Sequence, residues 1–389
     1  MAALPFLVLA LVLVSPPGLP ADGRVQTILA TPDDVRVTPA EAEAMLDRLY
    51  NLLEAGRNEA ARVAAEETVA AWDRLERASP GSYRPAQAEA LRLQALALWR
   101  LDQAEASLAP ARRAVEIWRL VVGDDPDRYS GDLIRTLNTY ANSLGDAGRF
   151  PEALAINGEA LALTAPLARE APEEYELGQA LLLQNRAQIF SDSGRGWEAI
   201  GAARQSVSRI EALEARYPGA QREELAEAYG ALAGYLGDST VWPEAAVYSG
   251  KQVATLRKLS IVDPAGYRGA LALALLRQDE ALAESSLPQF SLPLVAEATG
   301  LLRTLVREEP GNYGPELAAA TFRFGARLEA LGREQEALAL YGEAVERFRP
   351  LAEADPEEYG SRLQAAEQVT TDLARRLRTG APPPVADGR

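Results

Sequence analysis

The sequence predicts an all-α fold: a right-handed superhelical solenoid of about seven helical hairpins, closed by a C-terminal capping helix. Seven prolines stand 46 residues apart, and the third residue after six of them is tyrosine. Columns of small and large apolar residues return at the same period. A fixed period of this length is typical of stacked repeats, which grow by adding neighbours instead of enlarging one core. The prolines are Pro80, Pro126, Pro172, Pro218, Pro264, Pro310 and Pro356.

The third repeat shows how each unit is built from two helices. Its first helix is predicted over residues 132–147, and Gly148 is expected just past its end. The second helix is expected to begin near Pro151, in the first turn where proline is tolerated, and to end at Pro172. Apolar residues recur at helical spacing in both segments: Leu133, Leu137, Ala141 and Leu144, then Ala153, Ile156, Ala160 and Leu163.

Three columns of residues recur at the period of the repeat, and the aromatic column is predicted to pack between successive hairpins. One holds small residues, one holds large residues three places later, and one holds large aromatic residues eight places before a repeat proline. Aromatic side chains of this size bury a large apolar area, so the third column is interpreted as packing and not as a ligand cage. The columns are Ala95, Ala141, Ala187, Ala233 and Gly325; Leu98, Leu144, Phe190, Leu236, Leu282 and Leu328; and Trp72, Trp118 and Phe348.

The repeat array is predicted to occupy residues 38–378. Thr38, Pro39 and Glu41 make a helix start, with threonine as N-cap and glutamate three residues later. The C-terminal cap is predicted over Gly360–Arg378 as an unpaired first helix with a polar outer face. Residues 22–37 are interpreted as a linker, and residues 379–389 as a disordered, proline-rich tail.

The sixth repeat departs from the pattern. Asp279 stands in the column of small residues, and Pro288 and Pro293 fall where the turn and second helix are expected. Two prolines there predict a shortened helix or a longer loop. Such a change makes this repeat either a weak joint in the stack or a surface difference without a role.

The repeat resembles the tetratricopeptide repeat. A small residue, a large one three places on, then Gly-Arg and Glu-Ala-Leu make up the resemblance, which spans residues 38–377. The resemblance implies an interaction surface whose first helices line a concave groove. The usual period of that family is about 34 residues, so the period of 46 requires longer helices. The best copies are Ala141, Leu144, Gly148, Arg149, Glu152 and Ala153, and Gly325, Leu328, Gly332, Arg333, Glu336 and Ala337.

Composition excludes several classes of function. The chain has neither cysteine nor histidine, which removes disulfides, thiolate or imidazole metal sites and histidine-dependent triads. Its formal net charge of −16 opposes binding to nucleic acid and to anionic membranes. We therefore expect no enzymatic activity, no cofactor and no metal, and a protein or peptide partner that is cationic or neutral.

The first 21 residues predict a secretory signal. Residues 2–14 are an unbroken apolar run, too short for a bilayer-spanning helix, and a Pro-rich stretch then leads to Ala21. No lysine or arginine precedes the run. Export is the expectation, with an uncleaved anchor or a cytoplasmic protein as the alternatives; membrane attachment requires that the segment stay uncleaved.

Candidate binding residues lie on the groove side that the family resemblance implies for the first helices. Amide side chains repeat at matched positions four residues apart in the third and fourth repeats, and they can hydrogen-bond a peptide backbone whatever its sequence. The alternatives are a solvated helix face or bonds between hairpins. Glycines at the corresponding places of the fifth repeat serve either close approach of a partner or helix packing. The set is Arg92, Arg135, Asn138, Asn142, Gln184, Asn185, Gln188, Gly230 and Gly234.

The function expected from these features is a non-enzymatic scaffold or adaptor that binds a peptide or protein segment in its groove. The alternative is a sensory or regulatory module of a signalling system, whose superhelix responds to a ligand. The family hosts many partners, so the resemblance is informative about fold and not about partner identity.

Overall fold

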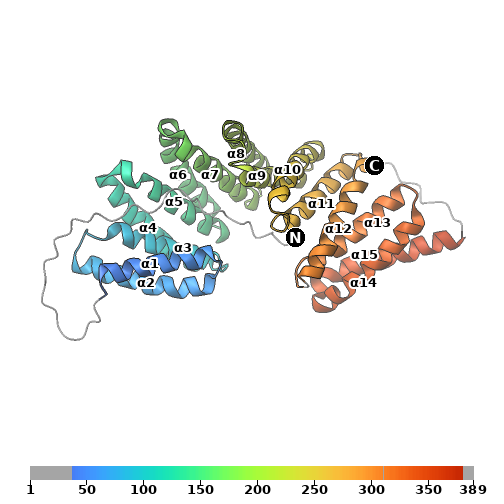
Figure 1. Ribbon diagram of the computed structural model, residues 1–389, viewed down its shortest axis with the longest axis horizontal. Coiled ribbons are helices and arrows are strands. Elements are labelled where there is room, and N and C mark those ends of the chain that lie inside the picture. The colour runs from blue at the N-terminus through green and yellow to red at the C-terminus, as the bar shows by residue number, and fades with distance from the viewer. Residues whose placement is uncertain (1–36, 310, 380–389) are drawn as a thin grey trace. The chain divides into compact units, whose positions relative to one another are not determined.

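The structure is a computed structural model that describes residues 37–309 and 311–379. These residues form fifteen α-helices, one short 3-10 turn and no strand (Figure 1). The first helices of the repeats are α1 (Pro39–Glu54), α3 (Arg84–Trp99), α5 (Pro126–Asp146), α7 (Pro172–Asp192), α9 (Arg222–Asp238), α11 (Arg268–Glu284) and α13 (Gly314–Ala330). The second helices are α2 (Asn58–Ala78), α4 (Ala104–Asp124), α6 (Phe150–Glu170), α8 (Gly196–Arg216), α10 (Trp242–Val262), α12 (Leu292–Glu308) and α14 (Glu334–Ala354).

Seven hairpins and a cap therefore make up the described chain, as the period predicts. The cap is α15 (Pro356–Thr379), four residues longer at its start than expected. Contacts divide the chain into two compact units, one ending at Arg209 and one beginning at Ile210, so that α8 crosses the boundary. Within each unit, helices pack on the next helix along the chain, which is the arrangement of an α-solenoid.

Several predictions concern segments outside this range. The signal sequence over 1–21, nearly all of the linker over 22–37 and the tail from 380 lie outside the described residues. Within the described residues, no helix combines the length and the apolar character needed to cross a bilayer.

The array starts where predicted. The Thr38 hydroxyl accepts a hydrogen bond from the Glu41 backbone N–H, and the Glu41 carboxylate accepts one from the Thr38 backbone N–H at 2.8 Å. This reciprocal capping box satisfies two backbone donors that a helix start would otherwise leave free. First helices also end as predicted, since Gly148 adopts a left-handed φ of +73° that glycine tolerates without strain.

The predicted start of the third repeat was wrong by six residues. Helix α5 begins at Pro126, not at 132, and Pro172 begins α7 as well as marking the end of α6. Acidic residues follow both prolines and favour a helix start there. Where glycine follows the proline instead, as at Gly81 and Gly219, the backbone turns with positive φ and the helix starts several residues later.

The aromatic column packs between hairpins, as predicted. Trp72 and Trp118, on second helices, are almost fully buried. Each indole lies 5.8 Å, centroid to centroid, from the tyrosine that follows the next repeat proline, Tyr83 and Tyr129 respectively. The Pro-x-x-Tyr motif thus supplies a ring that covers the preceding tryptophan, which fastens one hairpin to the next.

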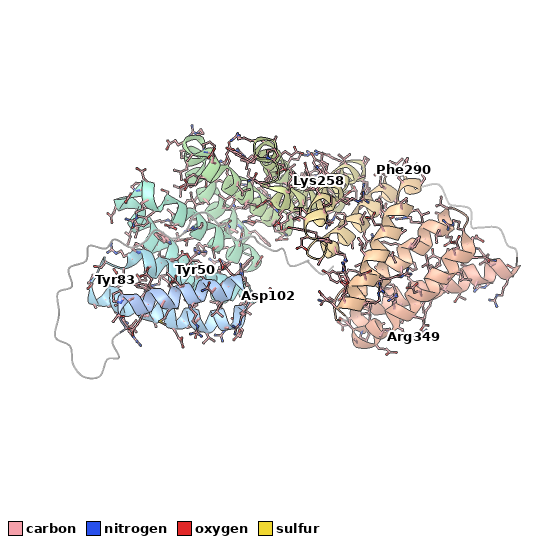
Figure 2. The ribbon with its side chains drawn as sticks, viewed as in Figure 1. Tyr50, Tyr83, Asp102, Lys258, Phe290 and Arg349 are labelled. Atoms are coloured by element: carbon pink, nitrogen blue, oxygen red, sulfur yellow. The ribbon has the colours of Figure 1, made fainter. Side chains whose placement is uncertain are left out.

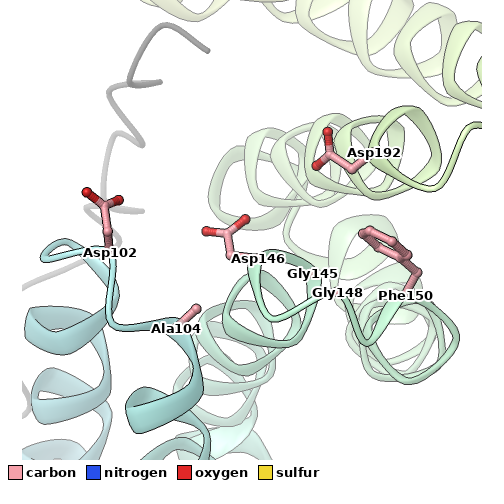
Figure 3. Close-up of a pocket in the computed structure, with 7 residues that line it drawn as sticks. All are labelled: Asp102, Ala104, Gly145, Asp146, Gly148, Phe150 and Asp192. Atoms are coloured by element: carbon pink, nitrogen blue, oxygen red, sulfur yellow. The ribbon is translucent and has the colours of Figure 1, made fainter. Parts of the chain in front are cut away.

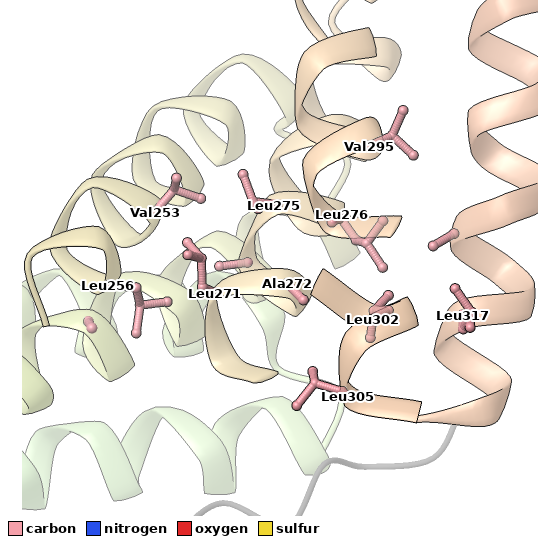
Figure 4. Packing of buried hydrophobic residues seen from close by; sticks show 14 residues of the cluster. Val253, Leu256, Leu271, Ala272, Leu275, Leu276, Val295, Leu302, Leu305 and Leu317 are labelled. Atoms are coloured by element: carbon pink, nitrogen blue, oxygen red, sulfur yellow. The ribbon is translucent and has the colours of Figure 1, made fainter. Parts of the chain in front are cut away.

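The core is a chain of such inter-hairpin clusters. In the second compact unit, one cluster joins five successive helices, α9 to α13 (Figure 4). Every member is contributed by a hairpin that cannot bury its apolar face alone, so each repeat depends on its neighbours for stability. The residues at the centre of this cluster are Leu256, Leu271, Leu275, Val295, Leu302 and Leu317.

A ladder of ion pairs joins consecutive second helices. Five pairs each link residues 40 apart. The earlier residue of the pair is acidic in some repeats and basic in others, and the later residue always carries the opposite charge. At the intervening place, the corresponding residues are Ala165 and Gln205, so neither partner is charged. Because the two charges of a pair are opposite in every case, the two positions are matched to each other across repeats. They are Asp73–Arg113 at 2.8 Å, Arg119–Glu159 at 2.7 Å, Glu211–Lys251 at 2.8 Å, Arg257–Glu297 at 2.5 Å and Arg303–Glu343 at 2.7 Å.

The sixth repeat has the predicted shortened second helix. Helix α12 has 17 residues where the other second helices have 21, and the 3-10 turn η1 (Pro288–Phe290) precedes it. Figure 2 marks Phe290, which is exposed at this turn. Asp279 is fully buried, and its carboxylate accepts two hydrogen bonds from the Arg327 guanidinium at 2.9 and 3.2 Å. The buried charge of Asp279 is therefore compensated by Arg327 on α13, the first helix of the following repeat.

We predict that the ladder can be completed. Substituting Ala165→Glu together with Gln205→Arg should stabilise the protein by about 0.5 kcal/mol, the value typical of exposed ion pairs. Thermal unfolding of the two single variants, the double variant and the parent gives the coupling between the two positions. Additive single effects would show that the ladder has no energetic role at this place.

We also predict an asymmetric response at the buried pair. Arg327→Ala should cost about 3–5 kcal/mol, because it leaves the Asp279 carboxylate buried and unpaired. Asp279→Ala should cost less, since the Arg327 side chain is 20% exposed and its head can reach water. In urea unfolding, the double variant should be more stable than Arg327→Ala alone. Equal losses in the two single variants would contradict this account.

Candidate functional site

The predicted groove residues of the first compact unit lie on α3, α5 and α7, on a surface we call the first-helix face. Its two arginines are neutralised locally. Arg92 donates to Glu89 at 2.6 and 2.8 Å, and Arg135 donates to Asp132. Burial alone would raise the pKa of Glu89, but the Arg92 guanidinium holds it below its ordinary value. Each of these arginines is thus already paired with a carboxylate on its own helix.

The amides fall into two groups. Asn185 donates from Nδ2 to the Oδ1 of Asn138 at 2.7 Å, which ties α7 to α5. Asn138 is 9% exposed, so this pair makes the bond between hairpins that the sequence left open as an alternative. Asn142 and Gln188, at equivalent places on the two helices, are half-buried. Asn142 has no hydrogen-bond partner among residues 37–309 and 311–379, whereas Gln188 donates to Asp192 at 2.7 Å.

Gln184 lies beside this tie, in the same column as Asn138. Its Oε1 is buried without a hydrogen-bond partner in the described structure. A buried acceptor left unpaired costs roughly 1–3 kcal/mol.

The two predicted glycines belong to the second compact unit and differ from each other. A Cβ at Gly230 would lie 2.2 Å from Nε2 of Gln252 and 3.0 Å from the Arg277 guanidinium, so this glycine makes room for packing within the protein. Gly234, one turn later on α9, has no atom of the described protein within 4 Å of a Cβ built there. Of these two glycines, Gly234 is the one with open space around it.

A pocket of about 400 Å³ opens where α3, α5 and α7 end (Figure 3). Asp102, Asp146 and Asp192 line it, with Phe150 on the far wall. Trp99 donates its indole N–H to Asp146 at 2.5 Å. Partial desolvation, together with the neighbouring Asp192 and Asp102 carboxylates, raises the pKa of Asp146.

Sequence reasoning missed these aspartates. The available signal was positional: α5, α7 and α9 all end on aspartate, at Asp146, Asp192 and Asp238. A carboxylate at a helix C-terminus meets the negative end of the helix dipole, which is the less favourable place for it. Among the described residues, no group of three or more acidic side chains is placed to hold a metal ion.

Glu227 was also missed. It lies on α9 one turn before Gly230 and is half-buried, with no hydrogen-bond or ion-pair partner in the described part of the chain. Burial and the nearby Glu224 and Glu223 carboxylates raise its pKa to about 7. This carboxylate therefore changes charge near neutral pH.

No family model and no curated protein matches the chain. Solved structures do match. The apo form of RapI aligns with a TM-score of 0.61 at 13% identity, over 86% of this chain and 84% of that chain. A Signal Transduction ATPase with Numerous Domains from Pyrococcus horikoshii, which carries a tetratricopeptide repeat sensor, gives 0.57 at 15% identity. That alignment covers 85% of this chain and 44% of the ATPase.

A third structure is BtubC from P. vanneervenii, with a TM-score of 0.51 at 18% identity, over 64% of this chain and 92% of that chain. The fold is of the tetratricopeptide type. At these identities the likeness is one of fold, so the face and the pocket are interpreted from this chain's own residues.

We predict that Glu227 makes stability depend on pH. Because its folded-state pKa lies above the ordinary value of 4.5, its neutral form favours folding, and this advantage is lost as the pH rises through about 7. Glu227→Gln should therefore stabilise the protein at pH 8 by roughly 1–2 kcal/mol, allowing for solvent screening, and change little at pH 4.5. Unfolding at both pH values tests this, with the exposed Glu353→Gln as control. A gain that is equal at both pH values would contradict it.

Proposed function

We propose that the protein is a non-enzymatic scaffold that binds an extended peptide or protein segment along the first-helix face of α3, α5 and α7. The observation that carries the proposal is the matched pair Asn142 and Gln188. They stand 46 residues apart, at equivalent places on adjacent helices, and both are half-buried. Amides at such a spacing can donate to and accept from one backbone at successive points.

Two further observations support a bound segment. The unpaired Oε1 of Gln184 offers an acceptor beside the amides. The Asn138–Asn185 bond fixes the distance between α5 and α7, so the amides are held on a rigid support. Arg92 and Arg135 are paired with carboxylates on their own helices, which makes a carboxylate-bearing partner the poorer fit.

The alternative is a sensory module of a signalling system. The ATPase from Pyrococcus horikoshii is described as having a tetratricopeptide repeat sensor, which is the observation that favours this alternative. The two proposals differ in what binding does. A scaffold holds its partner without a change in fold, whereas a sensor shifts between two arrangements when ligand binds.

We predict that Asn142→Ala with Gln188→Ala weakens binding of a purified partner segment about tenfold. Each lost amide bond should contribute about 0.5–1.5 kcal/mol to binding. The melting temperature should change little, because both amides are half-buried and neither takes part in the Asn138–Asn185 bond that ties α5 to α7. Calorimetric titration of the parent and the variant measures the loss, with the exposed Asn51→Ala and Gln205→Ala pair as control. If the double variant binds as tightly as the parent, the amides belong to a solvated surface and the proposal fails.

A further inference from the structure

The fifth repeat exchanges a large and a small residue between its two helices. Gly230 on α9 stands in a column that holds larger residues in every other repeat, and Gln252 on α10 stands in a column of small, buried residues. At steps of 46 residues, the first column is Leu46, Arg92, Asn138, Gln184, Gly230, Leu276 and Phe322, and the second is Thr68, Ala114, Ala160, Ser206, Gln252, Ala298 and Ala344. The side chain removed from α9 is thus replaced by one that comes from α10.

This exchange brings the Gln252 amide to Arg277 on α11, where α9, α10 and α11 pack on one another (Figure 1). Arg277 donates from Nη1 to the Oε1 of Gln252 at 2.9 Å. A Cβ at Gly230 would lie 2.2 Å from the Nε2 of Gln252 and 3.0 Å from Nη1 of Arg277, so both groups occupy the space that this glycine leaves. A guanidinium has only donors, so the amide turns its oxygen toward Arg277 and keeps its N–H groups available.

The Arg277 guanidinium makes no ion pair within residues 37–309 and 311–379, and its hydrogen bond there is the one to neutral Gln252. Burial lowers the pKa of Arg277, and the Glu280 and Asp238 carboxylates, which it does not contact, offset this only in part. Glu280 instead accepts from Arg323, at the matched place on α13. Four other arginines on first helices do meet carboxylates: Arg92, Arg135, Arg323 and Arg327. Arg277 therefore carries a half-buried charge without its counterion.

We propose that Arg277 and Gln252 form a binding site for one carboxylate group between α9 and α11. Guanidinium and amide N–H groups converge there, and the bond between the two side chains fixes their orientation before a ligand arrives. The site has room on one side, because no atom of the described protein lies within 4 Å of a Cβ built at Gly234, one turn further along α9. The site belongs to the second compact unit, so it goes beyond the function proposed for α3, α5 and α7.

Charge and shape favour a carboxylate over a phosphate. One guanidinium beside a neutral amide supplies a single positive charge, which one carboxylate balances. A planar carboxylate also matches the fork of N–H donors on a guanidinium. A phosphate group carries about −1.5 to −2 charges at pH 7, so it would leave excess negative charge near Glu280 and Asp238.

The test follows the Nε–H signal of Arg277 in NMR spectra of the full chain, identified by its loss in Arg277→Lys. The protein is titrated at constant ionic strength with acetate, with inorganic phosphate and with the blocked tripeptides Ala-Glu-Ala and Ala-Gln-Ala. Acetate and the glutamate peptide should shift the signal saturably, and phosphate and the glutamine peptide should bind at least tenfold more weakly. Tighter binding of the glutamate peptide than of acetate assigns the carboxylate to a protein segment, and equal binding assigns it to a small acid.

A double variant separates a binding site from an exchange that serves packing alone. Gly230→Gln with Gln252→Ser copies the residues that the fourth repeat has at these places, so it should keep the melting temperature while acetate binding weakens at least tenfold. Gln252→Ser alone is the second variant if the double variant is unstable. Lys258→Gln removes a positive charge from an exposed place on α10 and should leave the titration unchanged.

Three results would overturn the inference: no saturable shift in the parent, unchanged acetate affinity in the variants at Gln252, or tighter binding of phosphate than of acetate. The variant Asn142→Ala with Gln188→Ala should leave the Arg277 signal and its titration unchanged. Failure of this site and failure of the proposed function are therefore distinguishable.

Discussion

Each hairpin of this protein can bury its apolar surface only against the hairpins beside it, and the rest of the structure follows from this constraint. Trp72 and Trp118 illustrate it, since each is covered by a tyrosine that belongs to the next repeat. A contact of this kind must recur once per repeat, which is why the prolines and tyrosines keep one spacing along the chain. The spacing in turn places equivalent residues of successive helices next to one another.

This neighbour rule explains how departures from the repeat are tolerated. Several charges of one repeat find their partner in the adjacent repeat, on the exposed ladder of second helices and at the buried Asp279–Arg327 pair. In the ladder, the earlier residue of a pair is basic at Arg119 and acidic at Glu211, and its partner has the opposite charge in both cases. Local compensation allows one repeat to differ without disturbing those further away, because stability is a sum of nearest-neighbour terms.

The sequence was sufficient to predict what depends on period. Hairpin number, the glycine ends of first helices and the aromatic column follow from residues that repeat, whereas the Thr38 cap follows from a local capping motif. Helix α5 shows where this fails, because its start depends on whether an acidic residue or a glycine follows the proline, and the column of prolines alone does not separate the two cases. Buried Asn138 shows a second limit. Its spacing from Asn142 placed both on one helical face, but only tertiary contact shows that one is tied to Asn185 and the other is not.

The proximity of the pocket aspartates is still harder to predict from sequence, because they come from three repeats. Asp146 and Asp192 end α5 and α7, and Asp102 lies in the turn after α3. These aspartates differ from other acidic residues in their charge pairing. On the second helices, five acidic residues are each matched by an arginine or lysine one repeat away. At the ends of α3, α5 and α7 no such matching occurs, and the neighbouring arginines are bound to other groups. Part of the acidic character of the described chain therefore stays without a basic partner at the opening lined by Asp102, Asp146 and Asp192.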